Sequence, residues 1–133
     1  MKTIAVVFAV CIVGALGTLT EEHKAKLREH RDKCIDETKV DRTLVDKAHG
    51  GQWQEGDEKL QCFAACLLKK LGMMAEDGKL NEEVSLAKMT LDVGAEKARE
   101  IWDNCKDKTG ANTCAKGFEL MKCYTSKKTL LLA

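Results

Sequence analysis

Proline is absent from this chain, and the aromatic residues Phe, Trp and Tyr make up only 5% of it. After the first seventeen residues, β-branched residues are sparse as well, whereas Ala, Leu, Lys and Glu dominate. This composition favours helix over strand throughout the chain. It therefore excludes a mainly β architecture and predicts an all-α fold.

An excess of charge of one sign is also lacking, since 22 Lys and Arg side chains stand against 21 Asp and Glu side chains, with the signs interspersed. Such a balance gives no electrostatic reason to bind nucleic acid or an anionic membrane surface. We therefore expect no nucleic acid among the partners and no membrane insertion.

The motifs of common enzyme classes are missing too. The chain has no Gly-x-Ser-x-Gly, no glycine-rich phosphate loop and no His-Glu-x-x-His. Its two serines, Ser85 and Ser126, do not neighbour a histidine in the sequence. We therefore predict that the protein is not an enzyme and that it needs no cofactor.

The histidines give little support for a metal site. His23, His30 and Cys34 lie at helical spacing, as metal ligands can. A solvated helix face that ends in a disulfide cysteine explains them better, because a zinc site needs three or four converging ligands. We expect no metal. Two roles in mild acid stay open for the histidines, namely a switch that releases a ligand and a surface titration without consequence.

The longest apolar run lies at the start of the chain. It extends over Ile4–Val13 and is followed by small residues up to position 17. This run is well short of the roughly 20 residues that cross a bilayer, so we interpret residues 1–17 as a cleaved secretory signal rather than a membrane anchor. The mature domain, residues 18–133, is then expected to be secreted and extracellular.

Apolar residues at helical spacing, together with capping residues, predict six helices after the leader. Caps are expected at Thr20, Asp57, Asn81 and Asn112. The fourth helix spreads its apolar residues over two faces, which predicts burial on both sides. The predicted helices extend over about residues 21–37, 41–48, 58–71, 82–92, 95–108 and 113–126.

The chain is rich in cysteine, with seven in 133 residues. Cys11 belongs to the leader, and six others remain in the mature domain. Six cysteines in a small exported chain imply three disulfides, although the sequence alone does not choose among the fifteen pairings. Such cross-links would let a small bundle tolerate an internal cavity, which costs stability in proportion to its volume.

The pattern of these cysteines resembles the insect odorant-binding proteins, the family of pheromone and general odorant-binding proteins. The resemblance is carried by Cys62–Cys66 with three residues between, by the eight residues between Cys114 and Cys123, and by the methionine-rich turn Met73–Leu80. It covers residues 18–133 and implies a six-helix, disulfide-stapled bundle around an internal apolar pocket. The disulfides it implies are Cys34–Cys66, Cys62–Cys114 and Cys105–Cys123.

The same resemblance implies a function in transport, as in olfaction. The protein would be a secreted carrier that reversibly binds small hydrophobic molecules such as odorants or pheromones. Its partners would be this ligand and a chemosensory receptor, and it would be a monomer or a weak dimer. Two alternatives stay open: a non-sensory extracellular carrier on the same scaffold, and a small helical signalling or interaction protein without a pocket.

Candidate pocket residues come from two sources. Positions relative to the cysteines in the family map the pocket wall onto Leu27, Ala64, Leu68, Trp102, Leu120 and Tyr124. The helical stripes add Phe63, Leu67, Leu71, Leu86, Met89, Phe118 and Met121, and Trp53 would close one mouth. A stripe of this kind is more often plain core, so the interpretation as a pocket depends on the resemblance. The tail, residues 129–133, would either cover the pocket or fray.

Overall fold

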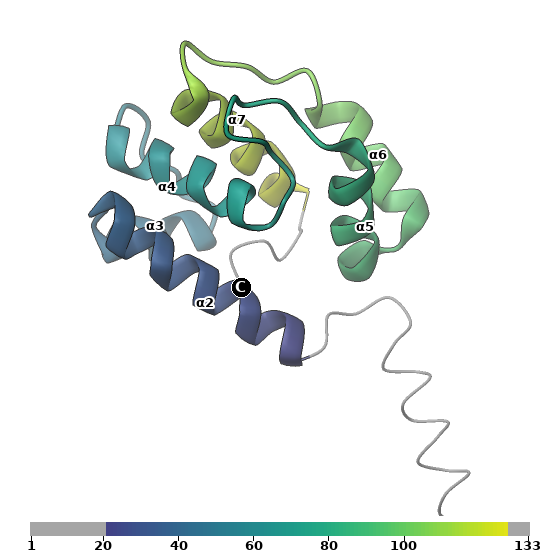
Figure 1. Ribbon diagram of the computed structural model, residues 1–133, viewed down its shortest axis with the longest axis horizontal. Coiled ribbons are helices and arrows are strands. Elements are labelled where there is room, and N and C mark those ends of the chain that lie inside the picture. Colours follow the sequence, from purple (N-terminus) through teal and green to yellow (C-terminus); the bar gives the residue numbers. More distant parts are fainter. Residues whose placement is uncertain (1–20, 128–133) are drawn as a thin grey trace, which may run out of the picture.

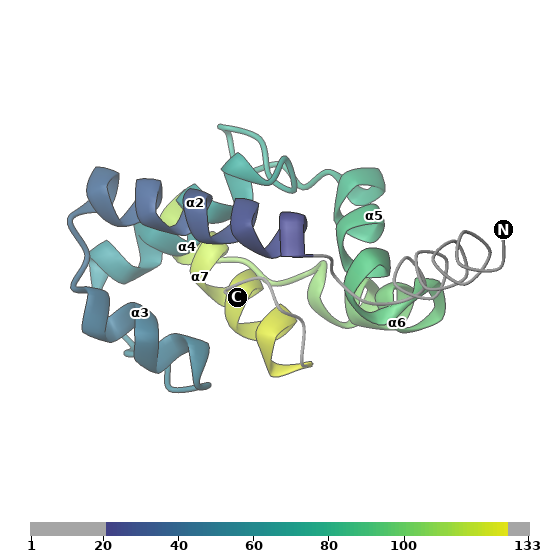
Figure 2. The same cartoon turned by 90° about the horizontal axis from the view of Figure 1, so that it is seen from below.

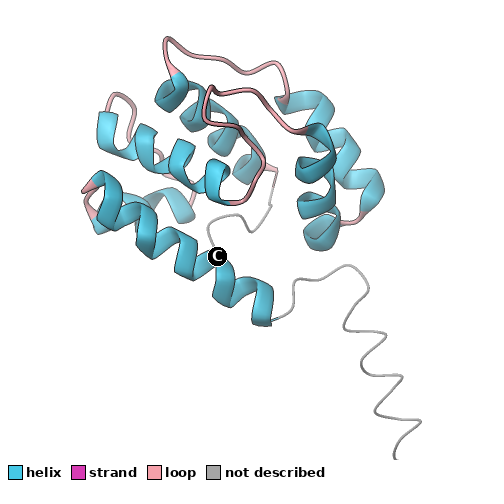
Figure 3. Ribbon diagram, viewed as in Figure 1, coloured by secondary structure: helices cyan, strands magenta, loops and turns pink. Residues whose placement is uncertain are grey.

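The computed structural model describes residues 21–127. The interpretations of residues 1–17 as a leader and of residues 129–133 as a pocket cover lie outside this range. Most of the described chain is helical (Figures 1 and 3). The helices are α2 (Glu21–Thr38), α3 (Arg42–His49), α4 (Glu58–Lys70), α5 (Glu82–Val93), α6 (Ala95–Cys105) and α7 (Thr113–Ser126).

No strand occurs in the described part of the chain, where the extended pairing is limited to a bridge between Met74 and Leu80. The prediction of an all-α fold with six helices is therefore confirmed. The fourth predicted helix is wrong in one respect, because α5 is not buried on both sides. Leu91 is 39% exposed, and only Ser85 and Met89 of this helix are fully buried.

Side-chain caps fix where four of these helices begin. Asp57, Asn81 and Asn112 each accept a hydrogen bond from the backbone N–H three residues later, at 2.8, 3.0 and 2.9 Å. Such a bond satisfies one of the free N–H groups at a helix start. Asp41 does the same for the N–H of Thr43, so it precedes α3 instead of forming its first residue.

One helix end differs from the prediction. Helix α6 ends at Cys105 and not at about residue 108. The N–H of Lys108 donates to the carbonyl of Cys105, which is the tighter i to i+3 bond that commonly closes a helix. The chain between Cys105 and α7 is therefore an irregular segment rather than another helical turn.

The helices form two groups. Helix α4 packs extensively on α7 and, on its other side, on α2, whereas α5 packs mainly on α6. Figures 1 and 2 show α5 and α6 side by side at one end of the molecule, with α2, α3, α4 and α7 at the other. A lesser contact between α6 and α7 joins the two groups.

Three disulfides cross-link these helices. Cys34–Cys66 joins α2 to α4, Cys62–Cys114 joins α4 to α7, and Cys105–Cys123 joins α6 to α7. These are the pairs that the family resemblance implied.

The contact between α4 and α7 depends on a glycine beside one of these disulfides. A Cβ at Gly117 would lie 2.6 Å from the Cα of Ala65, which is closer than a real Cβ approaches its neighbours. Cys62 and Cys114 lie in the same region, with their Cα atoms 4.3 Å apart. The absence of a side chain at Gly117 thus allows the two backbones to approach closely where the disulfide joins them.

Candidate ligand-binding site

Helix α4 contributes the broadest apolar face of the interior. Its stripe is fully buried at Phe63, Ala64, Leu67 and Leu68, and Leu71 just beyond the helix end is 7% exposed. The two disulfide cysteines of α4 lie off this stripe and are half-buried. The cysteines therefore bind neighbouring helices without occupying the apolar face.

Helix α7 supplies the opposite wall. Phe118, Leu120, Met121 and Tyr124 are each no more than 1% exposed, and α7 packs directly on α4. Burial raises the pKa of the Tyr124 phenol to about 12, because the charged phenolate is disfavoured away from water. The Tyr124 side chain therefore stays protonated at any physiological pH.

The remaining candidates come from three other helices and a loop. Leu27 of α2, Met89 of α5 and Trp102 of α6 are buried. Trp53 and Leu86 are half-buried and pack against this core. The structure thus brings all fourteen candidates into or against one apolar core, an arrangement that a filled core and a ligand site share. Their contact with a ligand stays a prediction.

Several core residues were not among the candidates. Ile35, Ala98 and Ile101 are buried with Met73 and Met74 of the turn after α4. The most unexpected is Ser85, which is 0% exposed. It precedes Met89 by one helical turn, so the spacing alone could have placed it on the inner face of α5.

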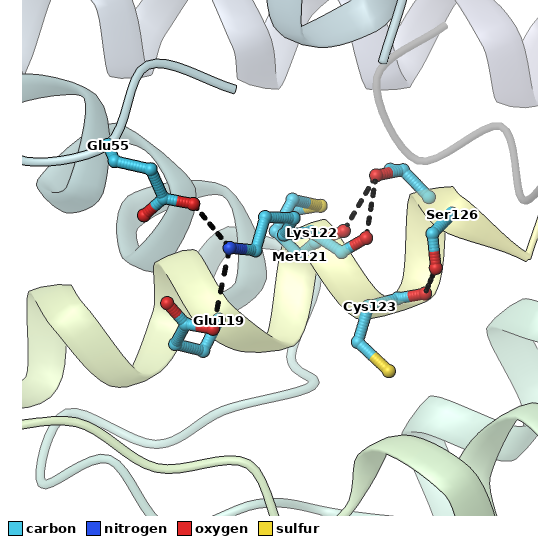
Figure 4. A network of polar contacts seen from close by, with 7 residues as sticks. Glu55, Glu119, Met121, Lys122, Cys123 and Ser126 are labelled. Atoms are coloured by element: carbon cyan, nitrogen blue, oxygen red, sulfur yellow. Dashed lines mark hydrogen bonds and ion pairs between the residues drawn. The ribbon is translucent and has the colours of Figure 1, made fainter. Parts of the chain in front are cut away.

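The loop between α3 and α4 is attached to α7 at Phe118 and Lys122. The ring of Trp53 meets Phe118 edge to face, with centroids 5.4 Å apart and an interplanar angle of 81°. Lys122 lies over the same phenyl ring at 5.3 Å and donates a hydrogen bond to Glu55 of the loop. It also pairs with Glu119 at 3.7 Å (Figure 4). Mainly because of the bond to Glu55, the pKa of Lys122 is raised.

The surroundings of His30 change its titration. Its side chain is half-buried on α2, and burial lowers its pKa, with Lys33, Lys70 and Lys26 acting in the same direction and Glu29 opposing them. His30 is therefore largely neutral near pH 7. No group of three or more metal-binding side chains occurs within residues 21–127.

Two surface hollows in the described part of the chain are polar and open to solvent. One, of about 410 Å³, lies between α6 and the end of α7, and the other, of about 310 Å³, lies over two of the disulfides. Lysine and glutamate side chains line both. Neither has the apolar lining that a hydrophobic ligand requires. None of the helices described here is both long and apolar enough to pass through a bilayer.

The sequence is similar to a known protein family and to several of its members. The model of the PBP/GOBP family matches residues 17–127. General odorant-binding protein 56a of Drosophila melanogaster is 30% identical over 94% of this chain and 89% of its own length. The B2 protein of Tenebrio molitor is 28% identical over 86% of this chain and 88% of its own length.

Solved structures agree in fold. The fatty acid binding protein OBP56a from the oral disk of the blowfly Phormia regina is 32% identical, with a TM-score of 0.67, over 83% of this chain and 95% of that one. Odorant binding protein 5 of Apis mellifera, at 19% identity, shares the fold with a TM-score of 0.70, over 84% of this chain and 93% of its own. On the family match and the relative from Drosophila, the chain belongs to the PBP/GOBP family, the pheromone and general odorant-binding proteins of insects.

Proposed function

We propose that this protein is a secreted extracellular carrier, which reversibly binds small hydrophobic molecules in the interior between its helices. The observation that supports this most is the convergence of apolar side chains from α2, α4, α5, α6 and α7 on one disulfide-linked interior, in a chain of the odorant-binding family. A chemosensory receptor that accepts the ligand is the second partner we propose. The carrier itself would be a monomer or a weak dimer.

The expected ligand is a molecule with a long apolar part. The related blowfly protein is named as a fatty acid binding protein, which supports an acyl chain as one ligand class. Each buried methylene contributes roughly 0.8 kcal/mol. A ten-carbon chain thus contributes about 8 kcal/mol, which leaves about 4 kcal/mol after an association cost of about 4 kcal/mol and corresponds to a millimolar Kd. A chain of about fifteen carbons reaches micromolar affinity on the same terms.

A fluorescent apolar probe tests the proposal. We expect the oxidised, folded domain, residues 18–133, to take up N-phenyl-1-naphthylamine saturably and to release it when dodecan-1-ol is added. A matched sample with its disulfides reduced should bind less, because the interior loses its covalent frame. Absence of displaceable uptake by the oxidised protein would contradict the carrier function and favour an interaction protein with a solid core.

A further inference from the structure

The hydroxyl of Ser85 is buried without a partner. The side chain is 0% exposed, and its Oγ has no hydrogen bond within the described structure. Four other hydroxyls on these helices each donate to a backbone carbonyl three or four residues earlier, at 2.6–2.8 Å. These residues are Thr38, Thr90, Thr125 and Ser126.

An equivalent acceptor is present for Ser85. The carbonyl of Asn81 lies one turn earlier and already accepts a hydrogen bond from the Ser85 N–H. The Ser85 hydroxyl does not donate to this carbonyl. Buried polar groups in native proteins are nearly always paired, and an unpaired one costs free energy comparable to a lost hydrogen bond. An exception of this kind calls for a partner that the polypeptide itself does not supply.

The position of Ser85 places this hydroxyl at the apolar interior. Ser85 and Met89 are one turn apart and are the two fully buried residues of α5. Helix α5 packs on α6, whose Trp102 is buried as well. The Ser85 hydroxyl therefore lies on the buried face of the α5 and α6 group, one turn from Met89.

On this basis we infer that Ser85 Oγ is the hydrogen-bonding anchor for the polar end of the carried ligand, and that this end is an uncharged oxygen group. The inference rests on the proposed carrier function. A serine hydroxyl can donate one hydrogen bond and accept others, which suits an alcohol, an aldehyde, an ester or a protonated acid.

The surroundings of Ser85 argue against a charged head group. Within residues 21–127, no Lys, Arg, His, Asp or Glu side chain is fully buried, and the two buried nitrogens of such side chains that lack a hydrogen bond, His30 Nδ1 and Arg31 Nε, belong to α2 and not to α5 or α6. An ionised carboxylate at Ser85 would leave water without a fully buried cation of α5 or α6 to pair with, which is far more costly than burying a neutral oxygen. A fatty acid would thus meet Ser85 in its uncharged form.

Competition binding with the probe N-phenyl-1-naphthylamine tests the anchor. For Ser85→Ala we expect dodecan-1-ol to bind about five- to tenfold more weakly, the effect of one hydrogen bond, while dodec-1-ene and the probe bind as they do to the unchanged protein. Thr90→Val is the matched control on the same helix, because the Thr90 hydroxyl is already bonded to the carbonyl of Leu86. It should not distinguish alcohol from alkene.

Each other outcome has a distinct meaning. Equal affinities of Ser85→Ala and the unchanged protein for dodecan-1-ol, or an equal loss for the alcohol and the alkene, would overturn the anchor. Dodecanoate at pH 8 binding as tightly as dodecan-1-ol would overturn the preference for an uncharged end. Failure of the unchanged protein to bind any probe would instead refute the carrier function. Should Ser85→Ala not fold, Ser85→Cys keeps the shape with a weaker donor and is expected to show the same selective loss.

Discussion

Burial of the Tyr124 phenol makes the stability of the fold depend on pH in the alkaline range. Its pKa is raised to about 12 by burial, against about 10 in an unfolded chain. Since the folded state holds the proton more tightly, the contribution of this group to stability is complete below pH 10. It is lost as the pH rises toward 12, and is at most about 3 kcal/mol.

The chain has one tyrosine, so phenolate absorbance at 295 nm reports this residue alone. We predict a titration midpoint near pH 12 for the folded protein and near pH 10 in guanidinium chloride. Circular dichroism at each pH would control for alkaline unfolding. A folded-state midpoint at the ordinary value near 10 would show that Tyr124 is in contact with water.

Single residues also show where the sequence stops being informative. Leu67 and Phe118 were expected inside because apolar side chains at helical spacing have few other places to go. Ser85 escaped prediction because a serine is usually solvated, although it lies one helical turn before the buried Met89. Whether the interior leaves room for a ligand depends on side-chain volumes in three dimensions, which a periodic pattern does not encode.

Among the connecting elements, the loop of residues 50–57 offers the clearest energetic test. It is attached to α7 by the Trp53 ring on Phe118 and by Glu55 on Lys122. The ring buries far more apolar surface than the carboxylate, whose side chain is 64% exposed. We therefore predict that Trp53→Ala lowers the free energy of unfolding by about 2 kcal/mol, less than for a fully buried aromatic.

Glu55→Gln is the matched comparison at the same loop. Because exposed ion pairs contribute little, we expect it to lower the free energy of unfolding by less than about 1 kcal/mol in urea denaturation at low salt, and by less still at 1 M salt. A larger loss for Glu55→Gln than for Trp53→Ala would mean that charge, and not ring packing, holds this loop.

Helix starts were easier to predict from the sequence than helix ends. The starts of α4, α5 and α7 were predictable because Asp57, Asn81 and Asn112 each satisfy a backbone N–H that has no partner within the helix. The end of α6 was not, since no glycine or proline follows Cys105 at once and the chain there leaves the helix by a tight turn. Caps are local, whereas such an end depends on where the next helix must begin.

The molecule as a whole consists of two helix groups that one disulfide cross-links. Cys34–Cys66 and Cys62–Cys114 lie within the group of α2, α4 and α7, whereas Cys105–Cys123 connects this group to α5 and α6. Since α5 packs mainly on α6, and α6 contacts α7 less, the position of the pair depends strongly on this one bond. Any ligand held between the groups would depend on it as well.

The double variant Cys105→Ala/Cys123→Ala tests this division. Its disulfide closes a separation of 18 residues, so its loss should lower the free energy of unfolding by about 3 kcal/mol in the chain-entropy model. We predict that amide hydrogen exchange then accelerates selectively in α5 and α6, and that affinity for N-phenyl-1-naphthylamine falls, because one wall of the interior opens.

The control, Cys34→Ala/Cys66→Ala, removes a bond of comparable expected energy but should accelerate exchange mainly in α2. If both variants accelerated exchange evenly over all helices, the molecule would unfold as one cooperative unit, and the division into two groups would be wrong.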